Sequence, residues 1–185
     1  EMVTEDGRKI YKTTDNLDAA RTSSTDDVWP GGGFGYSLTG NGYTMGEWDG
    51  GLVRDSHVEF GTRVQNMETG SFSSHATHVA GTMIAAGVDA DAKGMAYEGS
   101  LKAYDFNNSF NEISSETAGG LRISNHSYGA PGGFEFDGAD WYWYGDPSVS
   151  AVEDYTLEFY DFRPRRADEI VYNAPFHMWM MWAGD

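Results

Sequence analysis

Two side chains, Asp49 and His75, have the types and the placement that acid–base chemistry requires. Asp49 ends the strand-like run from Tyr43 to Trp48 and precedes two glycines, so we expect it at the carboxyl end of a strand. His75 follows two serines that are available as helix caps, so we expect it at the start of a helix. A carboxylate that accepts a hydrogen bond from Nδ1–H of a histidine fixes the tautomer of the ring and leaves Nε2 free to take a proton from a nucleophile.

The elements that must position this pair alternate between strand and helix. The pattern predicts strands at 43–48, 101–106 and 121–126, and helices at 75–87 and 114–119. This alternation indicates an α/β fold, with a central mostly parallel sheet flanked by helices. The helix at 75–87 consists of small and apolar residues and its two histidines, and we expect it to be buried on most sides, with a glycine at its C-terminal cap.

Several flanking segments complete the expected organisation. Residues 1–40 are expected to form a lead-in segment, with a short helix at 16–21 and a loop at 29–35, and residues 41–185 are expected to form a partial domain. Towards the C-terminus we expect an aromatic loop at 141–147, a helix at 148–160, a basic turn at 163–166 and a buried strand within the apolar run 176–183. Because that run ends so close to Asp185, the chain reads as a piece of a longer protein.

Composition excludes several classes of partner. The chain has 185 residues, 39% of them hydrophobic, and a net charge of −17, which opposes attraction to nucleic acids and to anionic membrane surfaces. No apolar run approaches the roughly 20 residues that cross a bilayer. The absence of cysteine excludes disulfides, thiolate metal sites and a cysteine nucleophile. We therefore expect no nucleic-acid partner and no membrane span.

Four segments resemble the motifs of the subtilases, the subtilisin-like serine peptidases, and they occur in that family's order. Residues 75–82 match the family's histidine motif, His-Gly-Thr-His-Val-Ala-Gly-Thr, at every position except Ala76. The other resemblances are to the aspartate motif at 47–52 with 57–60, to Gly-Val-Ala-Pro-x-Ala-x-Leu at 94–101, and to Val-Ile-Asn-x-Ser-x-Gly at 123–129. The resemblance covers residues 43–185 and implies a three-layer subtilisin-like domain that is truncated at its C-terminal side.

The resemblance also implies roles for individual residues. Asp49 would orient the histidine, His75 would be the general base and acid, and His78 would be a packing residue. The segment that pairs with the backbone of a polypeptide substrate would be formed by Ser127, Tyr128 and Gly129. The implied protein is a secreted bacterial serine endopeptidase that needs no cofactor.

Calcium is common in the family, and an acidic stretch at 88–92 is a candidate calcium site. Residues 88–92 read Val-Asp-Ala-Asp-Ala and lack the alternating oxygen ligands and the glycine of an EF-hand loop. We assign no calcium ligand and no other metal ligand.

Two departures from the family pattern bear on activity. Asp185 stands where the family has an asparagine that donates to the oxyanion, and an ionised carboxylate cannot donate. The Gly-Thr-Ser-x-Ala-x-Pro segment that carries the family's nucleophile does not occur among the 185 residues. We therefore expect the serine of the triad to lie beyond Asp185, and this chain alone to be inactive.

The sequence is also compatible with two other functions. The chain could be a catalytically inactive subtilase-like domain that binds peptides or partner proteins. It could also be a metal hydrolase with His75, His78 and Asp49 as ligands, although the i, i+3 spacing of the histidines departs from the His-Glu-x-x-His pattern of helical zinc sites.

Overall fold

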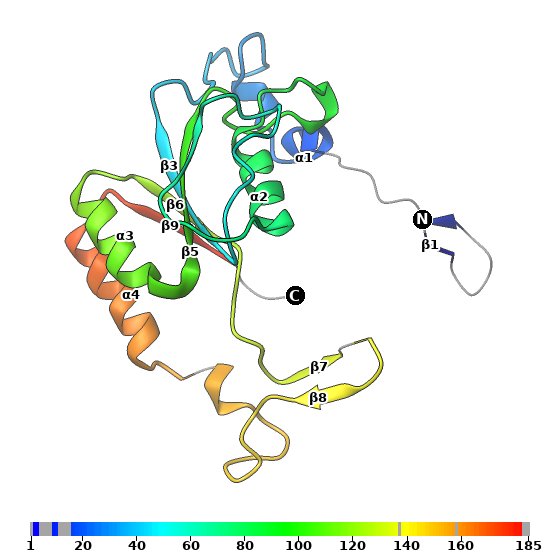
Figure 1. Cartoon of the computed structure of the whole chain (residues 1–185), viewed down its shortest axis with the longest axis vertical. Coiled ribbons are helices and arrows are strands. Elements are labelled where there is room, and N and C mark those ends of the chain that lie inside the picture. Colours follow the sequence, from blue (N-terminus) through cyan, green and yellow to red (C-terminus); the bar gives the residue numbers. More distant parts are fainter. Residues whose placement is uncertain (1, 4–8, 11–15, 137, 158, 183–185) are drawn as a thin grey trace. The chain divides into compact units, whose positions relative to one another are not determined.

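The computed structural model describes residues 2–3, 9–10, 16–136, 138–157 and 159–182 (Figure 1). The chain divides into two units, Glu1–Phe106 and Asn107–Asp185. In each unit helices accompany parallel strands, so the expected α/β class is confirmed. The predicted domain boundary after residue 40 stays a prediction.

A parallel sheet in the order β4-β5-β3 organises the first unit. Its strands are β3 (Thr44–Asp49), β4 (Val64–Asn66) and β5 (Ser100–Asp105). β3 pairs with β5 along its whole length, from Thr44 opposite Ser100 to Asp49 opposite Asp105. Every β3 residue after the first is buried, as expected for a strand covered on both faces.

The first unit begins with β1 (Met2–Val3) and β2 (Lys9–Ile10), which form an antiparallel pair, and α1 (Asn16–Thr22), which confirms the short helix expected at 16–21. The 3-10 turn η1 (Asp26–Val28) follows α1, and the 3-10 turn η2 (Ala90–Ala92) lies between α2 and β5. The Asn16 amide donates to the Lys93 carbonyl at 3.0 Å, and the Trp29 indole donates to the Met95 carbonyl at 3.0 Å. These bonds hold the segment before β3 against the segment before β5.

The helix α2 (Ser74–Ile84) buries one face only. The buried residues are Ala76, Ala80 and Ile84, four residues apart, whereas His75 and His78 are exposed. The expectation that this helix is buried on most sides was therefore wrong. Ser73 is the N-cap as predicted, and its hydroxyl accepts from the Ala76 N–H at 3.1 Å.

α2 also ends three residues before Gly87, the expected C-terminal cap. The N–H groups that would continue the helix are diverted to Glu59, whose backbone carbonyl accepts from Ala86 at 3.0 Å and whose carboxylate accepts from Gly87 at 2.8 Å. The carbonyls left behind, those of Thr82 and Met83, accept from the N–H groups of residues 95 and 96. Because the N–H groups and carbonyls at this end of α2 have these other hydrogen-bond partners, the helix stops at Ile84.

Glu59 and Arg63 form a clamp around the end of α2. The Glu59 carboxylate accepts from the N–H groups of Gly87, Val88 and Asp89 at 2.8–3.0 Å. The Arg63 guanidinium donates to the carbonyls of Ile84, Gly99 and Glu59 at 2.6, 2.9 and 2.7 Å. Burial raises the pKa of Glu59, but the three backbone N–H groups outweigh burial and hold it below its usual value.

The second unit contains α3 (Ser109–Ala118), β6 (Ile123–His126), α4 (Phe162–Asn173) and β9 (Met178–Met181). β6 pairs with β9 in parallel, from Ile123 opposite Met178 to His126 opposite Met181. α3 and α4 lie side by side (Figure 1), and each buries one isoleucine. The remaining elements are the strands β7 (Phe134–Phe136) and β8 (Trp141–Trp143) and the 3-10 turns η3 (Phe106–Asn108) and η4 (Tyr155–Leu157).

Three expectations for the second unit were wrong. The first three residues of the expected aromatic loop form β8, which pairs antiparallel with β7, and the rings of Phe134 and Trp143 contact each other across this pair at a tilt, with centroids 4.5 Å apart. The described residues within 148–160 form turns and η4 in place of a helix. The basic turn is the first part of α4, which begins there because the Asp161 carboxylate caps the N–H of Arg163 at 2.8 Å.

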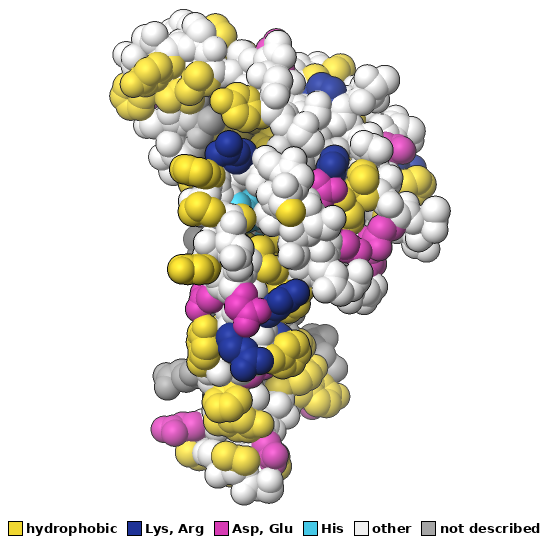
Figure 2. All heavy atoms as spheres, turned by 90° about the vertical axis from the view of Figure 1, so that its left-hand side faces the viewer, with side chains coloured by type: hydrophobic (Ala, Val, Ile, Leu, Met, Phe, Trp, Pro, Cys, Tyr) yellow, Lys and Arg dark blue, Asp and Glu magenta, His cyan; other side chains and the backbone are white. Residues whose placement is uncertain are grey.

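The apolar strand β9 is also more exposed than expected. Met178, Met180 and Met181 are 58%, 49% and 57% exposed, and β9 is the edge strand of its ladder. The face drawn in Figure 2 carries many hydrophobic side chains at the surface. Among the described residues no helix has the length and apolar character needed to cross a bilayer.

The clamp predicts a pH-dependent stability. The Glu59→Gln variant is expected to lower the free energy of unfolding at pH 7 by about 1–3 kcal/mol, because an amide replaces a carboxylate that accepts three hydrogen bonds. The pKa of Glu59 is lower in the folded protein than in the unfolded protein. The stabilisation by its carboxylate is therefore fully present above the pKa of the unfolded state and is lost as the pH falls through the pKa of the folded state. Urea unfolding between pH 7 and pH 3 measures it, with Glu153→Gln, at an exposed site, as the control. A difference from the wild type that stays constant over this range would contradict the prediction.

Candidate active site

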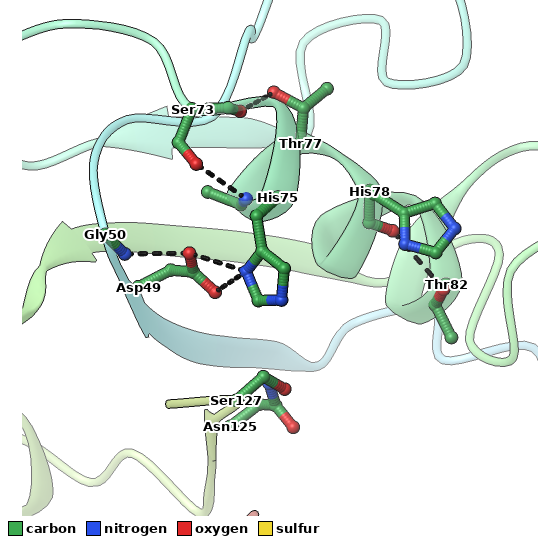
Figure 3. Close-up of polar contacts among 10 residues, drawn as sticks. Asp49, Gly50, Ser73, His75, Thr77, His78, Thr82, Asn125 and Ser127 are labelled. Carbon is green, nitrogen blue, oxygen red and sulfur yellow. Dashed lines mark hydrogen bonds and ion pairs between the residues drawn. The ribbon is translucent and has the colours of Figure 1, made fainter. Parts of the chain in front are cut away.

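The carboxylate of Asp49 lies at the carboxyl end of β3, as the sequence predicted, and is 2% exposed. Its Oδ1 accepts from the Gly50 N–H at 2.7 Å. Both carboxylate oxygens lie 2.8 Å from Nδ1 of His75 (Figure 3). A buried carboxylate is tolerated only when such donors are supplied, so this pair of contacts accounts for the burial.

A short parallel bridge brings the end of β3 and the start of α2 together. Leu52 pairs with Phe72: the Leu52 N–H donates to the Ser71 carbonyl at 2.9 Å, and the Ser73 N–H donates to the Leu52 carbonyl at 2.8 Å. Gly51 has φ +134°, and a Cβ at this position would lie 3.0 Å from the Ser71 carbonyl oxygen. Only glycine fits this conformation at this distance without strain.

His75 presents its second ring nitrogen away from Asp49. His75 is the second residue of α2, and its side chain is 59% exposed. Because a carboxylate can only accept, Nδ1 carries the proton that bonds to Asp49, and in the neutral ring Nε2 is unprotonated. Figure 3 shows this nitrogen on the side of the ring opposite Asp49. The arrangement can take a proton from a group that approaches Nε2.

A second buried carboxyl, that of Glu47, lies on the same face of β3 as Asp49. Glu47 is fully buried, and neither of its carboxyl oxygens has a hydrogen-bond partner within the described residues. Burial, with a smaller contribution from the charge of Asp49, raises the pKa of Glu47 well above its usual value. The sequence analysis missed this residue, although the i, i+2 spacing in a strand places the two carboxyl groups on one face.

The other predicted site residues lie in the second unit, directly after β6. The Ser127 hydroxyl accepts from the Asn125 amide at 2.9 Å, and the Tyr128 hydroxyl lies 3.0 Å from Nδ1 of His126. The ring of Trp182 packs so closely on Gly129 that a Cβ would collide with it. Asp185, the predicted oxyanion position, lies outside the described residues.

His75, His78 and Asp49, the three possible metal ligands, do not form a metal-binding cluster within the described residues. The ring of His78 lies apart from the Asp49–His75 pair in Figure 3, one turn further along α2. Within the described parts of the chain, no group of three or more His, Asp or Glu side chains could hold a metal ion. In the acidic stretch, the Asp89 side chain caps the N–H of Asp91 at 3.1 Å.

A cavity of about 860 Å³ lies beside α2 on the side of Thr77, His78 and Gly81. Phe60 and Phe72 contribute apolar walls. This size falls in the range of ligand pockets, but neither Asp49 nor His75 lines the cavity. The Asp49–His75 pair therefore lies outside this cavity, with the carboxylate buried and the imidazole exposed.

Comparisons with known proteins agree with the motifs. A family model described as the subtilase family matches residues 19–173, which is most of the chain. A search of the curated proteins finds no match.

Glu47 provides a test of the electrostatics beside Asp49. Because the pKa of Glu47 is raised in the folded protein, the unfolded protein releases this proton at a lower pH than the folded protein does. The free energy of unfolding therefore falls as the pH rises. We expect Glu47→Met to raise the free energy of unfolding at pH 8 by about 1–3 kcal/mol and by less at pH 4. The isosteric variant Glu47→Gln should flatten the pH dependence without the full gain. Urea unfolding at both pH values measures this, and a Met variant that is less stable than the wild type at pH 8 would refute it.

Proposed function

Because the chain belongs to the subtilase family of serine peptidases, we propose that Asp49 and His75 are two members of an Asp-His-Ser triad of an endopeptidase. The observation that carries the proposal is the contact of both Asp49 oxygens with His75 Nδ1 at 2.8 Å, at a strand end and a helix start. The Asp, then His order along the chain agrees with the order in subtilisin.

In the proposed reaction, Nε2 of His75 takes the proton of a serine hydroxyl while the serine oxygen attacks the scissile carbonyl carbon. The imidazolium then gives this proton to the leaving amine, and a water molecule repeats the cycle on the acyl-enzyme. The Asp49 carboxylate holds the ring and stabilises its cationic form throughout. This chemistry needs no cofactor, and we assign no calcium ligand.

The substrate is a polypeptide whose backbone pairs with residues 127–129. An extended peptide that adds to a strand edge gains main-chain hydrogen bonds without regard to its sequence. We further propose that the protein is secreted, which suits an enzyme that degrades external polypeptides.

The serine of the triad is the member that this sequence does not supply. No Gly-Thr-Ser-x-Ala-x-Pro segment occurs among the 185 residues. Loss of the serine costs roughly 10⁶ in turnover, because the triad members act as a unit. These residues alone are therefore expected to hydrolyse no peptide bond.

The alternative is a catalytically inactive domain that binds peptides or partner proteins. Asp185 favours it, since a carboxylate at an oxyanion position repels the charge that develops there. A nucleophile supplied by the source reading frame beyond Asp185 would favour the peptidase.

The experiment compares the chain with the product of its continuous source reading frame. The 185 residues should neither cleave a fluorogenic peptide nor be labelled by a fluorophosphonate, which acylates activated serines. The longer product should do both, with turnover reduced roughly 10⁶-fold in His75→Ala and roughly 10⁴-fold in Asp49→Asn. The exposed His78→Gln variant is the control and should keep full turnover. Full turnover in either triad variant would refute the assignment, and peptide binding without labelling would support the alternative.

A further inference from the structure

The cavity of about 860 Å³ beside α2 takes no part in the proposed reaction. All of its lining residues lie between Asn16 and Ala92, within the first unit. Pockets of this size usually combine apolar walls with a few polar groups that fix the orientation of a small molecule. The chemistry of the walls therefore indicates which kind of molecule would fit.

The wall that α2 contributes is low, because its residues are small. Thr77, Gly81 and Ala85 line the cavity and lie four residues apart, so they share one face of the helix. A Cβ added to Gly81 would meet no atom of another part of the chain within 4 Å, so the space above the helix backbone is open here. Phe60, which is 1% exposed, and Phe72 supply apolar walls. These walls suit an apolar body.

Arg54 brings a permanent positive charge to the lining of the cavity. Its guanidinium carbon lies 5.6 Å from the centre of the Phe72 ring, so the two side chains stack. Its backbone N–H donates to the Thr77 hydroxyl at 3.0 Å, which holds this residue beside α2. No acceptor among the described residues bonds to the guanidinium. Its N–H groups can therefore donate to an anion in the cavity.

The only acid among the described residues that line the cavity is Glu59, and its charge is already satisfied. Its carboxylate accepts from three backbone N–H groups at 2.8–3.0 Å, and the residue is 5% exposed. Nδ1 of His57 accepts from the Glu59 N–H at 3.4 Å, so in the neutral ring Nε2 carries the proton and can donate. The polar part of the lining therefore favours an anion over a cation.

The charge of Arg54 narrows the class of anion. The net charge of −17 repels anions at long range, so an anion is held only where donors contact it directly. One guanidinium balances the single charge of a carboxylate, to which it can donate two parallel hydrogen bonds. A phosphate monoester carries close to two negative charges at pH 7 and would be balanced only in part. The match is therefore to a carboxylate.

From these walls we infer that the cavity binds a small organic acid, with one carboxylate on an apolar body. The carboxylate pairs with the Arg54 guanidinium, and the body lies between the two phenyl rings and the face of α2 at Gly81. This inference does not depend on the proposed function, because neither Asp49 nor His75 lines the cavity.

Binding of 3-phenylpropanoate to the full chain tests the inference, with ¹H–¹⁵N spectra of labelled histidine as the measurement. At pH 7 the acid should shift the signals of His57 and His78, which line the cavity, and leave those of His126 and His177 unchanged. The neutral 3-phenylpropanamide has the same body and should bind about 10-fold more weakly, the effect of one charge-assisted pair. Equal affinities, or no shift of the cavity histidines with about 10 mM acid, would overturn the inference.

A variant of Arg54 tests the source of the preference for the acid. Arg54→Gln should bind the acid and the amide equally, with the affinity for the amide unchanged. Arg122→Gln is the matched control, because it removes a guanidinium that lies 5.2 Å from the Phe176 ring in the second unit. The control should keep the full preference. A preference for the acid that survives in Arg54→Gln would refute the pairing with Arg54.

Variants of Gly81 test the place of the apolar body. Gly81→Leu extends a side chain into the cavity and should weaken the binding of both ligands about 10-fold or more, whereas Gly81→Ala adds one methyl group and should keep most of the affinity. Both variants should fold, since a Cβ has room here and both residues favour a helix more than glycine does. Unchanged binding in a folded Gly81→Leu variant would place the acid elsewhere and refute the inference.

Discussion

The buried carboxylate of Asp49 is the constraint on which the site in the first unit depends. A carboxylate that is 2% exposed must receive hydrogen bonds, and here the donors are the Gly50 N–H and His75 Nδ1. These donors require the turn after β3 and the first turn of α2 to meet. Gly51 and the bridge of Leu52 to Phe72 meet that requirement. The clamp of Glu59 and Arg63 fixes the other end of α2, so that the helix bearing the imidazole is held at both ends.

The sequence predicted what local chemistry determines. Serines before a helix and glycines after a strand act over a few residues, and for this reason Asp49 and His75 were placed correctly. The end of α2 was misplaced because Glu59, nearly thirty residues away in the chain, takes the N–H groups that would have continued the helix. The basic run at 163–166 belongs to α4 and not to a turn, because the Asp161 side chain caps the N–H of Arg163, which is a local signal within reach of sequence analysis.

In the candidate site, too, the features set by neighbouring residues could be predicted from the sequence and those set by distant residues could not. Glu47 was within reach of sequence analysis, since it shares one face of β3 with Asp49. That its carboxyl group has no hydrogen-bond partner among the described residues could be seen only in the structure. The hydrogen bonds that join Ser124 to His126 and to His177 were not within reach of sequence analysis. The two histidines are 51 residues apart in the sequence, and only the pairing of β6 with β9 brings them together. The imidazoles of the two units differ in their surroundings. His75 is exposed and bonded to a carboxylate, whereas burial, and then the neighbouring His177, lower the pKa of His126 to about 3.

In the proposed site, Asp49 holds His75 as a base whose Nε2 is unprotonated. The most direct measurement is the tautomer of His75 in the long-range ¹H–¹⁵N spectrum of the histidine-labelled chain, at a pH where the ring is neutral, with the signal assigned by its loss in His75→Gln. The account predicts the Nδ1–H tautomer, with Nε2 unprotonated. A ring found as the Nε2–H tautomer would contradict it, because that ring would offer Asp49 no proton and would have no lone pair at Nε2 with which to act as a base.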